Sequence, residues 1–229
     1  MKYFQVSFDV EKTGLKKGIH QIQFDKKNIQ KDKAFNEFLN IFNSKPIDFL
    51  KNQVKIYSLK IPPIKAKLLK KANVTDIMAY TPNLGLFINN VYSEKYVKIL
   101  QAFNIGNYVS FEVVIESVTE KYFLLYFETI PLSEINYQKS KVITGHKVTN
   151  NLKYYEINSI NEYLEFRQVN VLGGFEKIAI SKANYGKDII KIQATSKSFY
   201  SEKLIDFLLD SEITGLKVDY KNSIQLEFY

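Results

Sequence analysis

Residues 92–95 read Tyr-Ser-Glu-Lys, and the same four residues recur at positions 200–203. An amphipathic stretch follows each copy and ends at a glycine, Gly106 in the first copy and Gly215 in the second. A serine here accepts hydrogen bonds from the first turn of a helix, and the following glutamate suits the positive helix end. The glycine supplies a left-handed exit from the helix. Each copy is therefore predicted to form an extended segment, a capped helix, a glycine and a strand.

Strand-like patterns surround the two copies. The runs 108–115 and 216–220 follow the glycines, and the aromatic run 122–127 has the length of a buried strand. Alternation of polar and apolar residues predicts further strands at 2–10, 19–24, 54–61, 154–157, 163–171 and 177–181. We expect residues 19–24 to form a hairpin with the first strand.

A helix is predicted after Asp32, which can cap it. Its apolar residues follow the i, i+3, i+4, i+7 spacing of one helix face: Phe35, Phe38, Leu39 and Phe42. Strands nevertheless outnumber helices, and the regular alternation of βαβ units is missing. The predicted fold class is therefore α+β, with mixed, mainly antiparallel sheets, a few packed amphipathic helices and two related strand-helix-strand units.

The net charge of +8 is unevenly distributed. Residues 1–71 hold 16 lysines against 6 acidic residues. We therefore expect a basic N-terminal region over 1–71, made of strands plus one helix, and a core over 72–229. The two similar units of this core span about 86–115 and 190–220, and the two regions are compatible with one compact domain.

The basic region would attract a polyanion or an acidic protein surface. Its densest cluster, residues 65–71, is either a solvated face or a binding surface. Arg167 is the single arginine among 32 basic residues, and base reading depends on arginine, whereas lysine still neutralises phosphates. A lysine-rich nucleic-acid-binding protein is therefore the alternative function, and the less favoured one.

Several chemistries are excluded by composition and motif. The chain has no cysteine and only two histidines, so disulfides, thiolate catalysis, sulfur-based zinc sites and histidine-rich metal sites are ruled out. Nucleophile-elbow, phosphate-loop and dinucleotide motifs are absent. The residues that remain as acid–base candidates have no partner at a recognisable spacing: His20, His146, the pair Glu112 and Glu116, and the pair Asp206 and Asp210. We expect no catalytic, cofactor-binding or metal-binding residues, and a binder rather than an enzyme.

The first ten residues do not resemble a signal peptide, because polar residues interrupt them. No run of about 18 apolar residues occurs anywhere in the chain. These two observations predict a cytoplasmic protein without a membrane partner.

The order of the motifs resembles a known family. Its first block is similar to residues 75–80, 86–88 and 92–108, its central block to 122–126 and 135–140, and its closing block to 190–192, 200–203 and 213–216. The family is a group of immunity proteins of bacterial polymorphic toxin systems. In the central block, where family members often carry acidic residues, this chain has Ser133 and Asn136.

The resemblance implies an inhibitor that binds a cognate toxin domain, and it supplies no catalytic residues. The basic charge of this chain predicts an acidic surface on that toxin. Tyr154, Tyr155 and Tyr163 are possible aromatic anchors, although neighbouring strand residues point to opposite faces, so one of Tyr154 and Tyr155 should belong to the core. A third possibility is an enzyme acting on a small molecule, which would require a pocket around His146 or a carboxylate pair.

Overall fold

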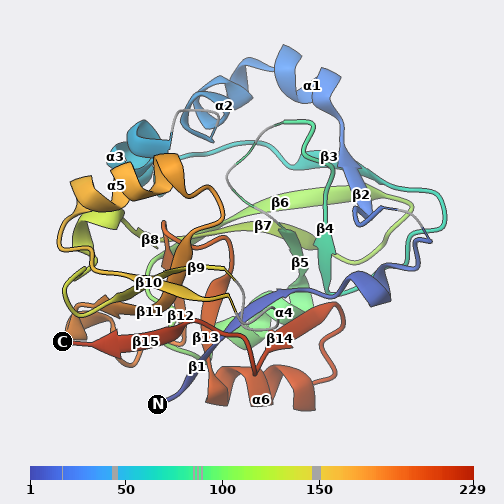
Figure 1. Ribbon diagram of the computed structural model, residues 1–229. Coiled ribbons are helices and arrows are strands. Elements are labelled where there is room, and N and C mark those ends of the chain that lie inside the picture. Colours follow the sequence, from blue (N-terminus) through green and yellow to red (C-terminus); the bar gives the residue numbers. More distant parts are fainter. Residues whose placement is uncertain (17, 43–45, 85, 87, 89, 146–150) are drawn as a thin grey trace. The chain divides into compact units, whose positions relative to one another are not determined.

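The computed structural model describes residues 1–16, 18–42, 46–84, 86, 88, 90–145 and 151–229. These residues contain six α-helices and fifteen β-strands, and the strands form three mixed, mainly antiparallel sheets (Figure 1). This arrangement confirms the α+β class. The chain divides into two compact units. Unit 1 contains residues 1–6, 129–202 and 218–229, and unit 2 contains residues 7–128 and 203–217.

Unit 2 is built on a six-stranded sheet. Its strand order is β2 (Ile22–Phe24), β3 (Ile64–Leu68), β6 (Tyr108–Glu116), β7 (Tyr122–Phe127), β5 (Asn90–Ser93) and β4 (Ile77–Ala79). The outer strands also meet, because the Gln21 N–H donates to the Ala79 carbonyl and the Thr81 N–H donates to the Ile22 carbonyl, at 2.8 and 2.9 Å. The sheet therefore curls until its two edges join.

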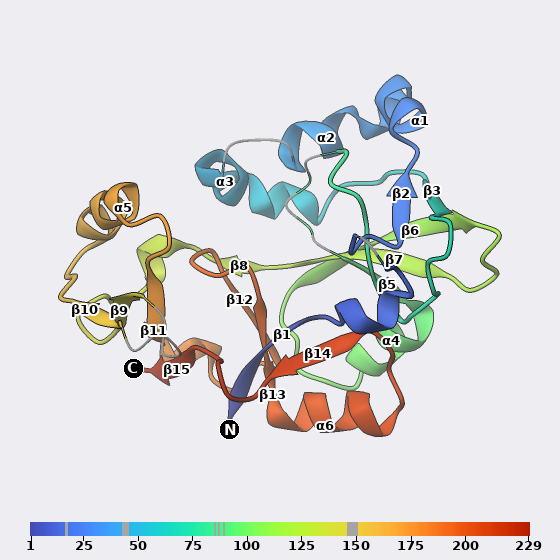
Figure 2. The same cartoon turned by 45° about the vertical axis from the view of Figure 1, so that its right-hand side comes forward.

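The core of unit 2 lies between this sheet and three helices, α1 (Lys26–Lys31), α2 (Asn36–Phe42) and α3 (Pro46–Ile56) (Figure 2). The helix spacing predicted after Asp32 is confirmed in α2, where Phe38 and Phe42 are fully buried. Their rings pack edge-to-face on Phe111 of β6, with centroids 5.3 and 6.2 Å away. Aromatic packing therefore fixes α2 against the sheet.

Unit 1 contains a five-stranded and a four-stranded sheet. The first has the order β14 (Leu216–Asp219), β1 (Tyr3–Phe8), β13 (Ser198–Ser201), β12 (Ile189–Ile192) and β8 (Thr129–Ile130). The second has the order β10 (Lys153–Tyr155), β9 (Lys141–Thr144), β11 (Gly174–Ile180) and β15 (Gln225–Phe228). Helix α5 (Ile160–Val169) contributes Tyr163 and Phe166 to the core of this unit.

Two predicted strands are wrong. Residues 163–171 lie mostly in α5, because Ser159 and Glu162 cap this helix: the Ser159 hydroxyl accepts from the Glu162 N–H, and the Glu162 carboxylate accepts from the Asn158 N–H. Residues 54–61 contain the end of α3 and a loop instead of a strand. In both places, capping and helical burial outweigh a short alternation.

The expected hairpin between the first strand and residues 19–24 is also wrong. β2 pairs antiparallel with β3, with Ile22 opposite Leu68, while β1 pairs with β13. The predicted boundary between residues 71 and 72 does not coincide with the boundary between the two compact units. β3 pairs in parallel with β6, so the basic region shares its sheet with the following residues.

The repeated Tyr-Ser-Glu-Lys stretches lie in matching hairpins. β4 pairs antiparallel with β5 in unit 2, where Ile77 lies opposite Tyr92. β12 pairs antiparallel with β13 in unit 1, where Ile189 lies opposite Tyr200. Helix α4 (Glu94–Leu100) follows the first hairpin and α6 (Glu202–Asp210) the second. Gly106 and Gly215 both have positive φ after their helices, and strands β6 and β14 follow, as predicted.

The repeat extends to a third strand that the sequence analysis did not detect. β7 places Phe123 opposite Tyr92, and β1 places Phe4 opposite Tyr200. Both phenylalanines belong to a Lys-Tyr-Phe tripeptide, at residues 121–123 and 2–4. The carbonyl of its lysine accepts a hydrogen bond from the first residue of the helix in each case, at 2.8 and 3.0 Å.

The third strand reaches the two sheets from different parts of the chain. In unit 2 it is β7, which follows the hairpin and helix, whereas in unit 1 it is β1, at the amino terminus. β1 thus corresponds to β7, and the next strand, β2, corresponds to β8. The carbonyl of Ile22 in β2 accepts a hydrogen bond from the Thr81 N–H, and the carbonyl of Ile130 in β8 accepts the equivalent bond from the Gln193 N–H. β1, which precedes the first hairpin along the chain, therefore pairs with the second hairpin. β7, which precedes the second hairpin, pairs with the first.

An Asp–Ser pair joins strand and helix in both copies, half-buried in the first copy and fully buried in the second. The Ser93 hydroxyl donates to Asp76 and the Ser201 hydroxyl donates to Asp188, each over 2.6 Å. The Ser93 oxygen also caps α4 by accepting from the Tyr96 N–H. Each aspartate directly precedes an isoleucine of the hairpin, so an Asp-Ile dipeptide extends the repeat toward the amino end. The pair fixes the angle between hairpin and helix.

Candidate functional site

The acid–base candidates that the structure describes lie on separate segments of the chain, and their carboxylates are exposed. Glu112 and Glu116 are exposed on β6, four residues apart on an extended strand, and Asp206 and Asp210 lie on the exposed side of α6. His20 is half-buried, and His146 lies outside the described residues. No group of three or more metal-ligating side chains occurs in the described part of the chain. No described helix has the length and apolar character needed to cross a membrane.

Lys191 is the one lysine of the described residues whose pKa is clearly shifted. It is half-buried on β12, and burial lowers its pKa to about 8. Such an amine is partly neutral near physiological pH. A lysine amine of lowered pKa can act as a base or a nucleophile, but a lowered pKa alone does not define an active site.

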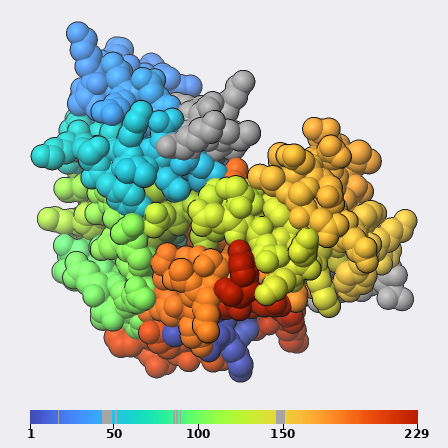
Figure 3. All heavy atoms as spheres, turned by 90° about the vertical axis from the view of Figure 1, so that its left-hand side faces the viewer, coloured from blue at the N-terminus to red at the C-terminus, as the bar shows by residue number. Residues whose placement is uncertain are grey.

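Residues 169–172 form an exposed turn at the end of α5, which we call the apolar turn. The exposed fractions of Val169, Val171 and Leu172 are 83%, 72% and 93%. Figure 3 shows the yellow-orange atoms of α5 and its surroundings at the surface. Three neighbouring apolar side chains in water are unfavourable unless a partner covers them.

Short-range hydrogen bonds fix the apolar turn. The Arg167 guanidinium donates to the Gly173 carbonyl and, over 3.1 Å, to the Val171 carbonyl. The Asn170 N–H donates to the Phe166 carbonyl and the Gly173 N–H to the Asn170 carbonyl, both over 2.8 Å. Gly173 packs so closely that a Cβ would lie 2.5 Å from the Phe166 ring. The turn is therefore an ordered apolar projection.

The three candidate tyrosine anchors have different environments. Tyr154 is 58% exposed on β10, whereas Tyr155 is half-buried and packs on Phe166, with ring centroids 4.8 Å apart. The two adjacent residues therefore point to opposite faces, as predicted. Tyr163 is 3% exposed in the core of unit 1. Its proposal as an anchor is wrong, because it lies on the inward face of a helix instead of on a strand.

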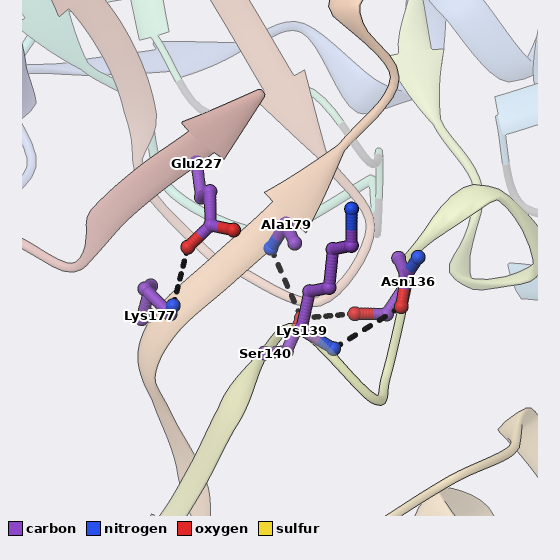
Figure 4. Close-up of polar contacts among 6 residues, drawn as sticks. All are labelled: Asn136, Lys139, Ser140, Lys177, Ala179 and Glu227. Carbon is purple, nitrogen blue, oxygen red and sulfur yellow. Dashed lines mark hydrogen bonds and ion pairs between the residues drawn. The ribbon is translucent and has the colours of Figure 1, made fainter. Parts of the chain in front are cut away.

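The second part of the central block, residues 135–140, forms a structural loop (Figure 4). The Ser140 hydroxyl donates to the Asn136 carbonyl over 2.7 Å and accepts from the Ala179 N–H over 3.0 Å. The Asn136 side chain accepts from the Lys139 N–H over 3.1 Å. Beside the loop, Lys177 of β11 pairs with Glu227 of β15. These polar groups bind one another, so the loop holds β11 in place.

A groove of about 970 Å³ lies in unit 2, on the outward side of β2, β3 and β6. We call it the lysine groove, since Lys26, Lys27, Lys65 and Lys67 line it. All four side chains are exposed, and none forms an ion pair within the described ranges. The predicted cluster at 65–71 is thus a surface of alternating residues: Lys65 and Lys67 point outward while Ile64 and Ala66 are buried.

The comparisons with known proteins identify no relative. No protein-family model matches this chain, and no curated protein is significantly similar to it. The resemblance to immunity proteins therefore stays a prediction.

Proposed function

We propose that this protein is an immunity protein, which acts in the cytoplasm by binding a cognate secreted bacterial toxin and neutralising it without catalysis. The observation that carries the proposal is the apolar turn at residues 169–172. The order of the sequence blocks supports it, because that order resembles the immunity family. The carboxylates that the sequence offered as acid–base candidates are exposed at the surface.

The apolar turn has the physical properties of a binding anchor. Covering a valine or leucine side chain contributes roughly 1.5–3 kcal/mol, and a few well-buried residues carry most of the binding energy of an interface. The hydrogen bonds of Arg167 and Asn170 order the turn before binding, which lowers the entropic cost of association. A convex apolar projection fits a concave apolar site, such as the substrate cleft of a toxin.

The test is co-expression with the toxin gene adjacent to this one. The wild-type chain should restore growth, and the double variant V171E/L172E should fail to do so because charged side chains oppose burial. We expect its toxin affinity to fall by about tenfold or more. Circular dichroism should be unchanged, since both side chains already contact water.

Val54→Glu is the matched control. Val54 is 74% exposed on α3 in the other unit, so its substitution adds a charge at an equally exposed apolar position. This variant should neutralise the toxin as the wild type does. Equal killing with and without the wild-type chain would overturn the proposed function. Full protection by V171E/L172E would overturn the role of the apolar turn.

A further inference from the structure

The lysine groove has a local excess of positive charge that the apolar turn does not explain. Four lysines line it, against the two carboxylates of Asp25 and Glu116. Asp25 is already engaged, because it accepts the Asn28 N–H over 3.1 Å and caps α1. Uncompensated ammonium groups around a concave surface raise the local concentration of anionic ligands.

Backbone pairing fixes the positions of these lysines. β3 runs parallel to β6, with Lys65 beside Val114 and Lys67 beside Glu116. The Asp25 N–H donates to the Lys65 carbonyl over 2.8 Å, which ties the start of α1 to β3. Lys26 and Lys27 follow directly in α1. Two lysines from a strand and two from a helix therefore line one groove.

The rest of the lining is suited to a polypeptide. Val114 is 50% exposed and gives the groove an apolar patch. The amides of Gln23 and Gln30 can bond to peptide N–H and C=O groups. Glu116 can accept from a backbone N–H or pair with a basic residue of the ligand. Charge, apolar surface and amides together match an acidic chain with interspersed small apolar residues.

Nucleic acid fits this lining less well. The single arginine, Arg167, belongs to the other unit, and the only aromatic residue of the lining, Phe24, is 2% exposed. Single-stranded nucleic acid is held largely by stacking on exposed aromatic rings. The observations therefore favour protein over nucleic acid.

We propose that the lysine groove binds an acidic, extended polypeptide segment, whose carboxylates pair with Lys26, Lys27, Lys65 and Lys67. The identification of this segment as part of the toxin rests on the proposed function, whereas the binding itself does not. The groove would be a second contact, chemically different from the apolar turn. It would mainly speed the encounter with the partner.

The experiment uses the full chain and a fluorescent ten-residue peptide of alternating glutamate and small apolar residues. Fluorescence anisotropy at low salt should show binding that weakens as salt rises. The double variant K65E/K67E should bind about tenfold more weakly or worse. The control K153E/K182E makes the same change in net charge at exposed lysines of unit 1, and it should retain wild-type affinity.

Three results would overturn the proposal. These are absence of peptide binding at low salt, equal weakening by both double variants, and tighter binding of a single-stranded oligonucleotide of matched charge than of the peptide. The measurement contains no toxin, so its failure is distinct from failure of the co-expression test. A V171E/L172E chain that has lost toxin neutralisation should still bind the peptide.

Discussion

Asp76 shows how a single side chain of unit 2 links the hairpin before α4 to the turn after α6. Its carboxylate accepts the Ser93 hydroxyl over 2.6 Å and the Thr214 N–H and hydroxyl over 2.8 and 2.7 Å. Burial acts to raise the pKa of Asp76, but these hydrogen bonds outweigh burial and leave the pKa below its ordinary value. The charged form is therefore the form that stabilises the fold.

The lowered pKa of Asp76 predicts how the stability of the protein depends on pH. A carboxyl whose pKa is lower in the folded state stabilises the protein above its unfolded pKa of about 3.9. That contribution is lost as pH falls through the folded pKa. Asp76→Asn should therefore be less stable than the wild type at pH 7 and lose less stability between pH 6 and pH 3. Urea unfolding across this range measures both; parallel pH curves for the two proteins would contradict the assignment.

Arg167 allows a second prediction at this scale. Arg167→Lys keeps the charge but cannot reach the Gly173 and Val171 carbonyls together. The apolar turn should loosen, with faster hydrogen exchange at residues 171–173 and faster dissociation from the toxin. The loss of one such hydrogen bond costs about 1 kcal/mol. Unchanged exchange in this turn would show that Arg167 does not order it.

At the scale of elements, the glycine after each helix is required for a specific reason. Gly215 has φ +82°, and a Cβ there would lie 2.5 Å from the Ile77 carbonyl oxygen. Gly215→Ala should therefore destabilise the protein by about 2–4 kcal/mol, through left-handed strain and a backbone clash.

Gly18 provides the matched control for Gly215. It lies in the same unit with φ +87°, and a Cβ there would meet nothing within 4 Å. Gly18→Ala should cost only about 1 kcal/mol, the strain alone. Thermal melts of the two variants measure the difference. Equal losses would mean that the contact with Ile77 contributes nothing.

At the scale of the whole molecule, β1 is an internal strand of a sheet whose other members come from the second half of the chain. Tyr3 and Val6 are buried there, and the Gln5 N–H donates to Ser223. Removing residues 1–6 should abolish hydrogen-exchange protection in β12 and β13, while β6 and β7 stay protected. A six-residue N-terminal extension keeps β1 and should leave both regions protected. Persistent protection of β13 in the truncated chain would contradict the pairing.

The sequence predicted the modules of this fold better than their connections. The Tyr-Ser-Glu-Lys echo correctly indicated the capped helix α4, its partner α6, and the positive φ of Gly106 and Gly215. The pairing of β1 with the second hairpin and of β7 with the first was missed. The Lys-Tyr-Phe tripeptide that marks both strands lies far along the chain from the hairpin that follows it. Strand pairing depends on long-range burial, which local alternation does not encode.

The apolar turn was missed for a different reason. Val169 and Val171 continue an alternation that is typical of a strand, whereas Ser159 starts a helix ten residues earlier. The exposure of these valines results from the end of α5, which no composition signal marks. The lysines of the groove were detected as a charge excess, but their shared position requires the pairing of β3 with β6.

The exchanged strands have a consequence for biosynthesis. β1 is synthesised well before its neighbours β13 and β14, which begin at Ser198 and Leu216. At about 5–20 residues per second, the earliest strand waits roughly 10–40 s for its partners. During that interval its backbone donors and acceptors are open to pairing with other nascent chains. Vectorial synthesis therefore leaves β1 without its sheet neighbours until β13 and β14 emerge.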